Sequence, residues 1–181
     1  MWGGLTSFGQ QYLPDQFRSL ANSAGPWFAV VMGSIYVARP RPVLAIILGI
    51  LGLVVMNEAY GVVSRWRDYA YSGGFSSVWN LIALIVGPAA GIGATWLRSS
   101  RPVLVALGAS AAAAAFIGEA LYGLTVVGDT TSPVFWSIEL AAGLCLVALG
   151  AVRLRNVVAS SILVLASSAG AALFYAAYSR L

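Results

Sequence analysis

The sequence predicts an all-α fold, a polytopic membrane helical bundle of six transmembrane helices arranged as three similar hairpins. Hydrophobic residues make up 60% of the 181 residues and charged residues only 9%, whereas soluble domains average about 45–50% and about 25%. Three arginine pairs each separate two long apolar runs. Because charged side chains are costly at the bilayer centre and collect in turns, these pairs mark three turns, at Arg39/Arg41, Arg98/Arg101 and Arg153/Arg155.

A transmembrane helix needs about 20 mainly apolar residues. Five stretches meet this requirement, and they cover residues 42–64, 78–97, 102–127, 134–152 and 157–178. The remaining span, the first in the chain, is harder to place, because the apolar stretch over residues 26–38 holds only 13 residues. Extended back to about residue 20 or 16, it reaches the required length and contains a break at Gly25-Pro26.

The three hairpins, over about residues 15–64, 77–127 and 133–181, are expected to form a single integral membrane domain over residues 1–181. The first two resemble each other, because Arg-Pro-Val-Leu occurs at 41–44 and 101–104, and Glu-Ala at 58–59 and 119–120. Since each hairpin starts on the same side, the copies would be parallel repeats about an axis along the membrane normal. The alternative is that polar turns and apolar runs look alike by chance.

The distribution of arginine predicts the orientation. The three turns hold six arginines and no acidic residue, whereas the opposite side holds four arginines together with three aspartates. Arginine collects in cytoplasmic loops, so we expect the basic turns in the cytoplasm and both termini outside. All ten cationic side chains are arginine, which is typical of a GC-rich bacterial genome and predicts a location in a bacterial plasma membrane.

Three glutamates, Glu58, Glu119 and Glu139, lie in apolar spans at a similar depth near the predicted outer face. Acids in lipid are costly and usually mark a functional site or a paired structural role, so they predict an outward-facing site for a cation or a cationic group. Tyrosines and tryptophans near the same boundary are typical of an interfacial belt or, alternatively, of a cation cage. In the structural alternative, each acid reaches the interface or pairs with Arg65, Arg67 or Arg180.

A Gly-Pro step interrupts the first and third predicted spans at corresponding positions. Unwound backbone at such breaks can bind a ligand, and polar side chains precede the first break. The predicted substrate-binding residues are therefore the three glutamates together with Asn22, Ser23, Gly87 and Pro88. The alternative is an ordinary proline kink, which membrane helices tolerate.

The small residues over 87–93 also form a face that allows close helix approach, either within the chain or in a homo-oligomer.

Composition disfavours several kinds of chemistry. The chain has no histidine and one cysteine, so a transition-metal site or a haem would have almost no ligands. No nucleophile-elbow or phosphate-loop motif occurs, and the arginines are dispersed in turns. We therefore expect no catalytic residue, no metal, no cofactor, no enzyme activity and no nucleic-acid partner.

The leading hypothesis is binding or transport of a small, cationic solute, at a site between the broken spans that is open towards the three glutamates. The alternative is a non-catalytic membrane subunit or scaffold that packs against a partner through its small-residue faces. The expected partners are the lipid bilayer, a small-molecule ligand, and either a second copy of the chain or another membrane protein.

Three stretches, LANSAGPW, GPAAGIG and GEALYG, make the chain resemble an uncharacterised family of small multi-pass bacterial membrane proteins. The resemblance spans most of the chain and is carried by Asn22, Ser23, Trp27, Gly87, Pro88, Gly91, Gly118 and Glu119. It implies a membrane location and a multi-pass helical architecture, and it implies no particular activity.

Overall fold

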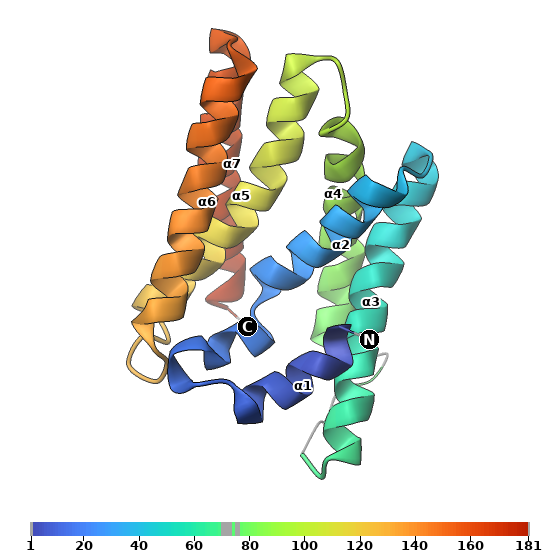
Figure 1. Cartoon of the computed structure of the whole chain (residues 1–181), viewed down its shortest axis with the longest axis vertical. Helices are drawn as coiled ribbons and strands as arrows, with labels where there is room; N and C mark the ends of the chain where they lie inside the picture. The colour runs from blue at the N-terminus through green and yellow to red at the C-terminus, as the bar shows by residue number, and fades with distance from the viewer. Residues whose placement is uncertain (1, 70–73, 75–76, 181) are drawn as a thin grey trace.

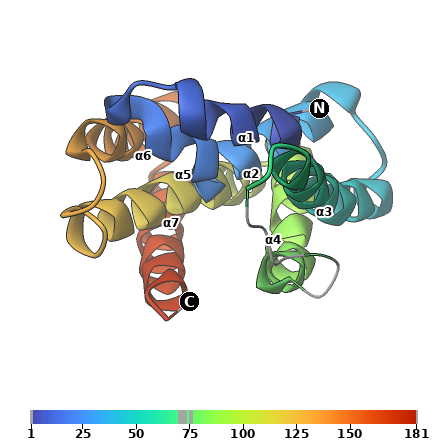
Figure 2. The ribbon, with the colours of Figure 1, turned by 90° about the horizontal axis from the view of Figure 1, so that it is seen from below.

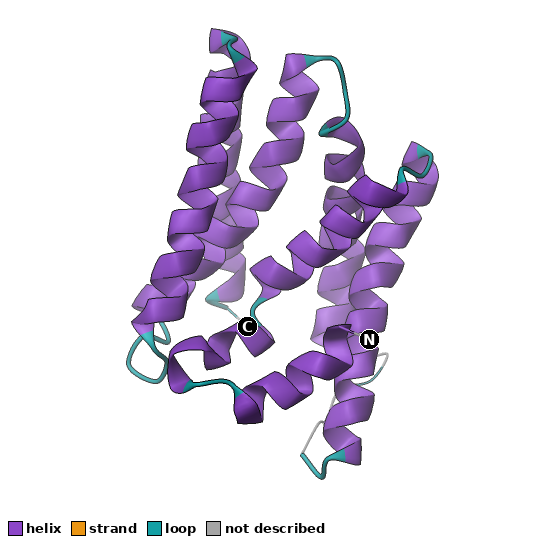
Figure 3. Ribbon diagram, viewed as in Figure 1, coloured by secondary structure: helices purple, strands orange, loops and turns teal. Residues whose placement is uncertain are grey.

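The computed structural model describes residues 2–69, 74 and 77–180, and every regular element in these residues is a helix (Figure 3). In chain order the elements are α1 (Trp2–Tyr12), the 3-10 helix η1 (Asp15–Asn22), α2 (Ala24–Ala38), α3 (Pro42–Trp66), α4 (Val78–Trp96), α5 (Pro102–Thr125), α6 (Pro133–Leu154) and α7 (Val157–Tyr178). Three of these helices start with a proline, at a position where the missing N–H would have no partner within the helix.

Within the described residues, the five helices α3 to α7 are long and apolar enough to cross a membrane. They also present large apolar side chains outward, for example Val152, Leu165 and Leu173, which are 76%, 69% and 72% exposed. Water-soluble proteins rarely expose large contiguous apolar faces, whereas such faces suit a lipid environment. The predicted class of an all-α chain with membrane-spanning helices is confirmed at this level.

The first predicted span is not a continuous helix. It consists of η1, the extended residue Ser23, and α2, which has 15 residues. At 1.5 Å per residue α2 is about 22 Å long, which is shorter than a hydrocarbon core of about 30 Å. The break comes at Ser23, two residues before the predicted Gly25-Pro26 step, and Pro26 lies in the first turn of α2. Five long helices and one short helix therefore stand where six complete spans were predicted.

The three arginine-containing turns lie at one end of the molecule, at the top of Figure 1, where α2 meets α3, α4 meets α5, and α6 meets α7. The turn between α5 and α6 lies at the opposite end, and α1 and η1 run across the molecule near that end. The basic turns thus share one end of the helices, as the alternation of arginine pairs and apolar runs requires.

Two groups of helices pack on either side of α2. The most extensive contacts join α3 to α4 and join α5 to α7 and α6. The short helix α2 touches α3, α4 and α5, while α1 packs on α3 and η1 packs on α6, so the N-terminal segment connects both groups (Figure 2). Helices within each predicted hairpin do touch, but their closest partners belong to other hairpins. The predicted arrangement as three hairpins is therefore not confirmed.

The Gly87-Pro88 step does not interrupt its helix, contrary to the prediction, because Pro88 lies inside the continuous helix α4. Gly87 instead packs against the backbone of α3, where an added Cβ would lie 2.5 Å from the Cα of Ile50 and 2.8 Å from the carbonyl carbon of Gly49. At Gly91 an added Cβ would meet the backbone of α3 in the same way. The small-residue face of α4 is thus used for close packing within the chain.

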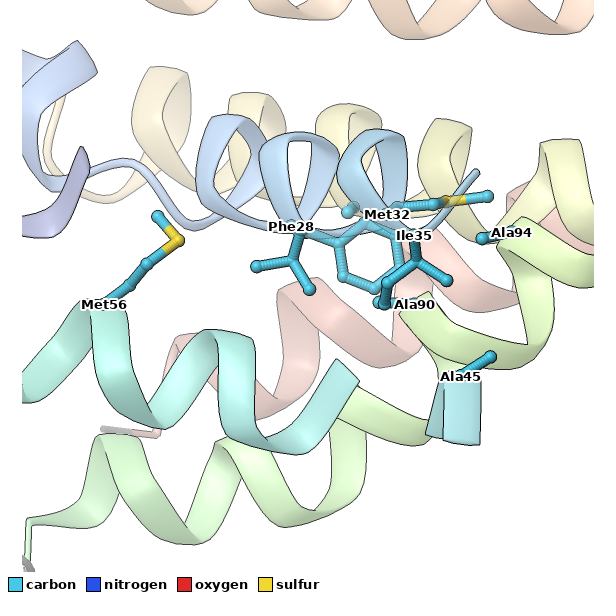
Figure 4. Close-up of a cluster of buried hydrophobic side chains, with 9 residues drawn as sticks. Phe28, Met32, Ile35, Ala45, Met56, Ala90 and Ala94 are labelled. Carbon is cyan, nitrogen blue, oxygen red and sulfur yellow. The ribbon is translucent and has the colours of Figure 1, made fainter. Parts of the chain in front are cut away.

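The buried face of α2 forms the centre of the largest apolar cluster. Phe28, Met32 and Ile35 project from α2 and are each less than 5% exposed. They pack against small and flexible side chains of the neighbouring helices, which include Ala45 and Met56 of α3 and Ala90 and Ala94 of α4 (Figure 4). This packing fixes the position of α2 and therefore the position of its N-terminus.

Candidate functional site

The first backbone N–H groups of α2 have no acceptor within their own helix. Ser23 occupies the N-cap position with extended backbone angles, and its side chain does not cap its own helix. The first N–H groups of any α-helix have no intrahelical acceptor. Pro26 removes one such donor, because proline has no N–H. The N–H groups of Ala24 and Gly25 therefore need an acceptor from elsewhere.

Glu119 of α5 supplies that acceptor. Its Oε1 accepts a hydrogen bond from the Ala24 N–H at 2.7 Å, and its Oε2 accepts one from the Gly25 N–H at 2.5 Å. The Ser23 hydroxyl lies 2.8 Å from the same Oε2. A carboxylate at a helix N-terminus also interacts favourably with the positive end of the helix dipole. Glu119 thus caps α2 from a helix that lies 95 residues further along the chain.

Glu139 of α6 approaches the same point with far fewer partners. Its Oε1 lies 3.1 Å from the Ser23 hydroxyl oxygen, and its Oε2 is buried without any hydrogen-bond partner. The residue is 2% exposed, and Glu119 is 1% exposed. We call Glu119 and Glu139 the acid pair.

Glycine at position 25 makes the acid pair possible. An added Cβ would overlap the Oε1 of Glu139 and would lie 3.2 Å from the Oε2 of Glu119. A side chain here would therefore displace one or both carboxyl groups from the start of α2. The Gly-Pro step predicted as a helix break serves two distinct purposes, since glycine admits the acids and proline removes an unneeded donor.

A cluster of aromatic rings on α5 and α7 reaches the acid pair through Tyr178. The hydroxyl of Tyr178 interacts with Glu119, and its ring contacts Tyr122 edge-on and stacks on Phe174, with centroid separations of 4.9 and 5.0 Å. Gly123 lets the Trp136 ring pack directly on α5. Aromatic side chains of α5 and α7 therefore gather around Tyr178, the residue that interacts with Glu119.

The acid pair has no arginine partner within the described part of the chain. The ion pair found there joins Arg18 to Asp15 near the surface. Arg67, one of the three predicted partners, instead donates to the backbone oxygen of Ser7 and to Gln11 and lies over the ring of Phe8. Two buried acids in contact without a compensating cation are an electrostatically costly arrangement.

Other predicted site residues lie outside this cluster. Glu58 accepts a hydrogen bond at 2.7 Å from Asn80 of α4, which also accepts one from Asn57. Asn22 is the last residue of η1 and is exposed, unlike the neighbouring Ser23. Gly87 and Pro88 belong to the contact of α4 with α3 described above. Of the seven predicted residues, the structure brings together Ser23, Glu119 and Glu139.

Sequence reasoning missed the backbone donors of Ala24 and Gly25 as parts of the site and missed the aromatic group at Tyr178. The sequence predicted this tyrosine only as one of many residues in an interfacial aromatic belt, because the neighbouring sequence does not indicate which acid it contacts. The donors were implied by the helix break, but their acceptor lies on a distant helix.

No group of three or more acidic, histidine or cysteine side chains suited to a metal ion occurs among the described residues. Two open surface hollows lie where α6 meets α7, and they are lined by residues such as Arg153 and Arg155. Neither hollow includes the acid pair. Because Glu119 and Glu139 are only 1% and 2% exposed, the acid pair is closed off from solvent in this conformation.

These features define a helical membrane protein with a buried acid pair at the start of a short internal helix. The chain belongs to a family of unknown function (DUF6518), whose family model matches residues 1–181. No curated protein and no solved structure matches the sequence significantly.

Proposed function

We propose that the protein binds a small cation at the acid pair, as a solute-binding or transport protein of a bacterial plasma membrane with its basic turns in the cytoplasm. The observation that carries the proposal is a pair of touching, buried carboxyl groups with no arginine partner among the described residues, one of whose oxygens has no hydrogen-bond partner. Acidic residues in membrane spans commonly mark ion or substrate pathways.

In this proposal Glu119 caps α2 and Glu139 binds the cation. Glu119 holds the start of α2 through three donors, so its charge is already matched by a helix N-terminus. Glu139 contributes the unpartnered oxygen that faces the incoming cation. The neighbouring rings of Tyr122 and Tyr178 add the negative faces that attract cations.

The sealed site limits the ligand and requires an opening step. A small ion or a compact organic cation fits a site with so little exposure better than an extended solute does. The η1–α2 junction is the natural moving part, because a single residue in extended conformation separates the two helices there. Short or interrupted helices at a binding site are a recurrent feature of membrane transporters.

Thermal unfolding in detergent tests the proposal. The unfolding temperature is measured with millimolar Na⁺, K⁺ or guanidinium, and choline at equal ionic strength serves as the bulky control. A cation at about 100 times its Kd stabilises the native state by about 2.7 kcal/mol. We expect one of the three cations to raise the unfolding temperature, and we expect Glu139→Gln to abolish the rise.

Glu58→Gln is the matched control, because Glu58 lies in a membrane helix but outside the acid pair. It should keep the full response. The proposal fails if none of the cations stabilises the wild-type protein, or if Glu139→Gln responds as the wild type does. Uptake of the active cation into liposomes then separates a transporter from a protein that only binds.

The rival role is a non-catalytic subunit or scaffold that docks on a membrane partner or a second copy. That role depends on small-residue faces that remain free, whereas Gly87 and Gly91 are occupied by α3. Cation binding is therefore the better-supported proposal. Absence of any cation response together with a stable co-purifying membrane protein would favour the rival.

A further inference from the structure

The Ser23 hydroxyl contacts both acids of the acid pair, but its single proton can serve only one of these two contacts. The Ser23 hydroxyl oxygen lies 2.8 Å from the Oε2 of Glu119 and 3.1 Å from the Oε1 of Glu139. A hydroxyl group carries a single proton and can donate only once. If Ser23 donates to one acid, its contact with the other is favourable only when that acid donates in return.

The surroundings identify Glu139 as the acid that carries the extra proton. Glu119 accepts from two backbone N–H groups as well as from Ser23, and these donors stabilise the ionised form. Glu139 contacts only the Ser23 hydroxyl and Glu119 itself, accepts from no backbone N–H group, and its other oxygen has no partner. A buried carboxylate with so few donors is costly, whereas a neutral carboxylic acid is much less so.

We infer that Glu139 holds a proton on Oε1 in the empty site, and that a bound cation replaces this proton. The inference rests on the proposed cation site and adds the coupling ion to it. On exchange, the O–H bond of Glu139 breaks, the proton passes to water on the side where the site opens, and the freed carboxylate binds the cation.

This exchange leaves the net charge of the site unchanged. Before binding, the pair carries one negative charge on Glu119, and after binding two carboxylates and one monovalent cation again sum to one negative charge. A site that admitted the cation without releasing the proton would change its buried charge, which is costly in a membrane interior. One proton is therefore released for each monovalent cation bound.

Few other groups can take up or supply the proton. The titratable side chains that face Glu139 are Glu119 on α5 and Tyr178 on α7, with Tyr122 beside Tyr178. From η1, the other element packed on α6, Asp15 and Arg18 form a salt bridge with each other near the surface.

Infrared spectroscopy of the cation-free protein tests the position of the proton. A protonated carboxylic acid has a carbonyl stretching band that a carboxylate lacks. We expect this band in the wild type and in Glu58→Gln, and we expect Glu139→Gln to remove it. The glutamine amide reproduces a neutral, donating group beside Ser23, so this variant should fold. Absence of the band in the wild type, or its persistence in Glu139→Gln, overturns the inference.

Proton release tests the exchange. The purified wild-type protein in weakly buffered detergent solution is mixed with Na⁺, K⁺ or guanidinium in the presence of a pH dye, with choline as the control. We expect one proton per bound cation, with no release from Glu139→Gln. Cation binding without proton release overturns the exchange but leaves the proposed binding function intact. The infrared band without any cation binding contradicts the proposed function and supports the position of the proton.

Discussion

Glu58 and Glu119 occupy matching places in two similar stretches of sequence, yet they end in different environments. Each lies on a helix that begins with Pro-Val-Leu directly after an arginine, and each is followed by alanine. Glu58 is partly exposed and takes an amide hydrogen bond from Asn80. Glu119 is fully buried and takes two backbone hydrogen bonds from the start of α2.

The comparison shows that depth in the membrane does not by itself decide what an acidic side chain does. The two glutamates lie at similar distances along their helices, but only one of them meets a helix N-terminus. The Asn80 side-chain amide donates to Glu58, whereas the first backbone N–H groups of α2 donate to Glu119, which also interacts with the helix dipole. A second acid, Glu139, lies beside Glu119, and the proposed binding site is there.

The largest effect should come from exchanging Glu119 for glutamine. Glu119→Gln removes a charged acceptor and turns an NH₂ group towards the backbone donors of α2. Because hydrogen bonds to charged groups contribute about 1.5–3 kcal/mol, we expect a loss of roughly 2–4 kcal/mol in the free energy of unfolding. Denaturant titration in detergent micelles measures this loss.

Glu58→Gln is the counterpart, and it should change the same free energy by less than about 1 kcal/mol, since a neutral amide can replace its single bond to Asn80. Equal losses in the two variants would contradict the distinction between the two environments. A stability for Glu119→Gln equal to that of the wild type would show that α2 does not need its carboxylate cap.

A smaller effect is expected from Gly87→Ala, which tests how the α3–α4 region is held together. The added Cβ would meet backbone atoms of Ile50 and Gly49, so the two helices must separate. Overpacking of this kind costs about 1–3 kcal/mol. Gly33→Ala is the matched control, because its Cβ meets no atom within 4 Å, and it should stabilise α2 by about 0.5–1 kcal/mol. Thermal unfolding of both variants measures the two changes. Equal changes in stability would contradict close packing of Gly87 against α3.

A smaller loss than that of Gly87→Ala should follow Arg67→Ala, which removes contacts between α1 and the end of α3 without touching the acid pair. The guanidinium of Arg67 donates to Ser7 and Gln11 and lies 4.2 Å from the centroid of Phe8. We expect a global loss of only about 1 kcal/mol, with faster hydrogen exchange confined to α1. Exchange that also accelerates in α2 would mean that α1 and the start of α2 open together.

The five long spans could be predicted from the sequence because each is an apolar run bounded by arginine or by a polar turn. Their ends in the structure lie within a few residues of the predicted ones. The acid pair was also accessible in part, since spacing along the helices places Glu119 and Glu139 at similar depth. The break before α2 was predicted from Gly25-Pro26, although it lies at Ser23, two residues before that step.

Other features were out of reach of sequence patterns. Helix α1 begins with a glycine pair that reads locally as a turn, but Gly3 lies so close to α3 that an added Cβ would be 2.9 Å from the Cα of Met56. Pro88 has the same Gly-Pro context as Pro26, and yet its helix continues. The identical dipeptide gives two outcomes because neighbouring helices decide whether the backbone can remain helical.

The sequence by itself determined that the chain is helical, that it lies in a membrane, and that its three arginine-pair turns share one end of the bundle. These properties depend on each segment's own composition, because every backbone group in lipid must be satisfied within its helix. Only the tertiary structure decided which acid meets the open start of α2 and which acid pairs with an amide. Those contacts join helices far apart in the chain, so they depend on how the helices pack rather than on any local pattern.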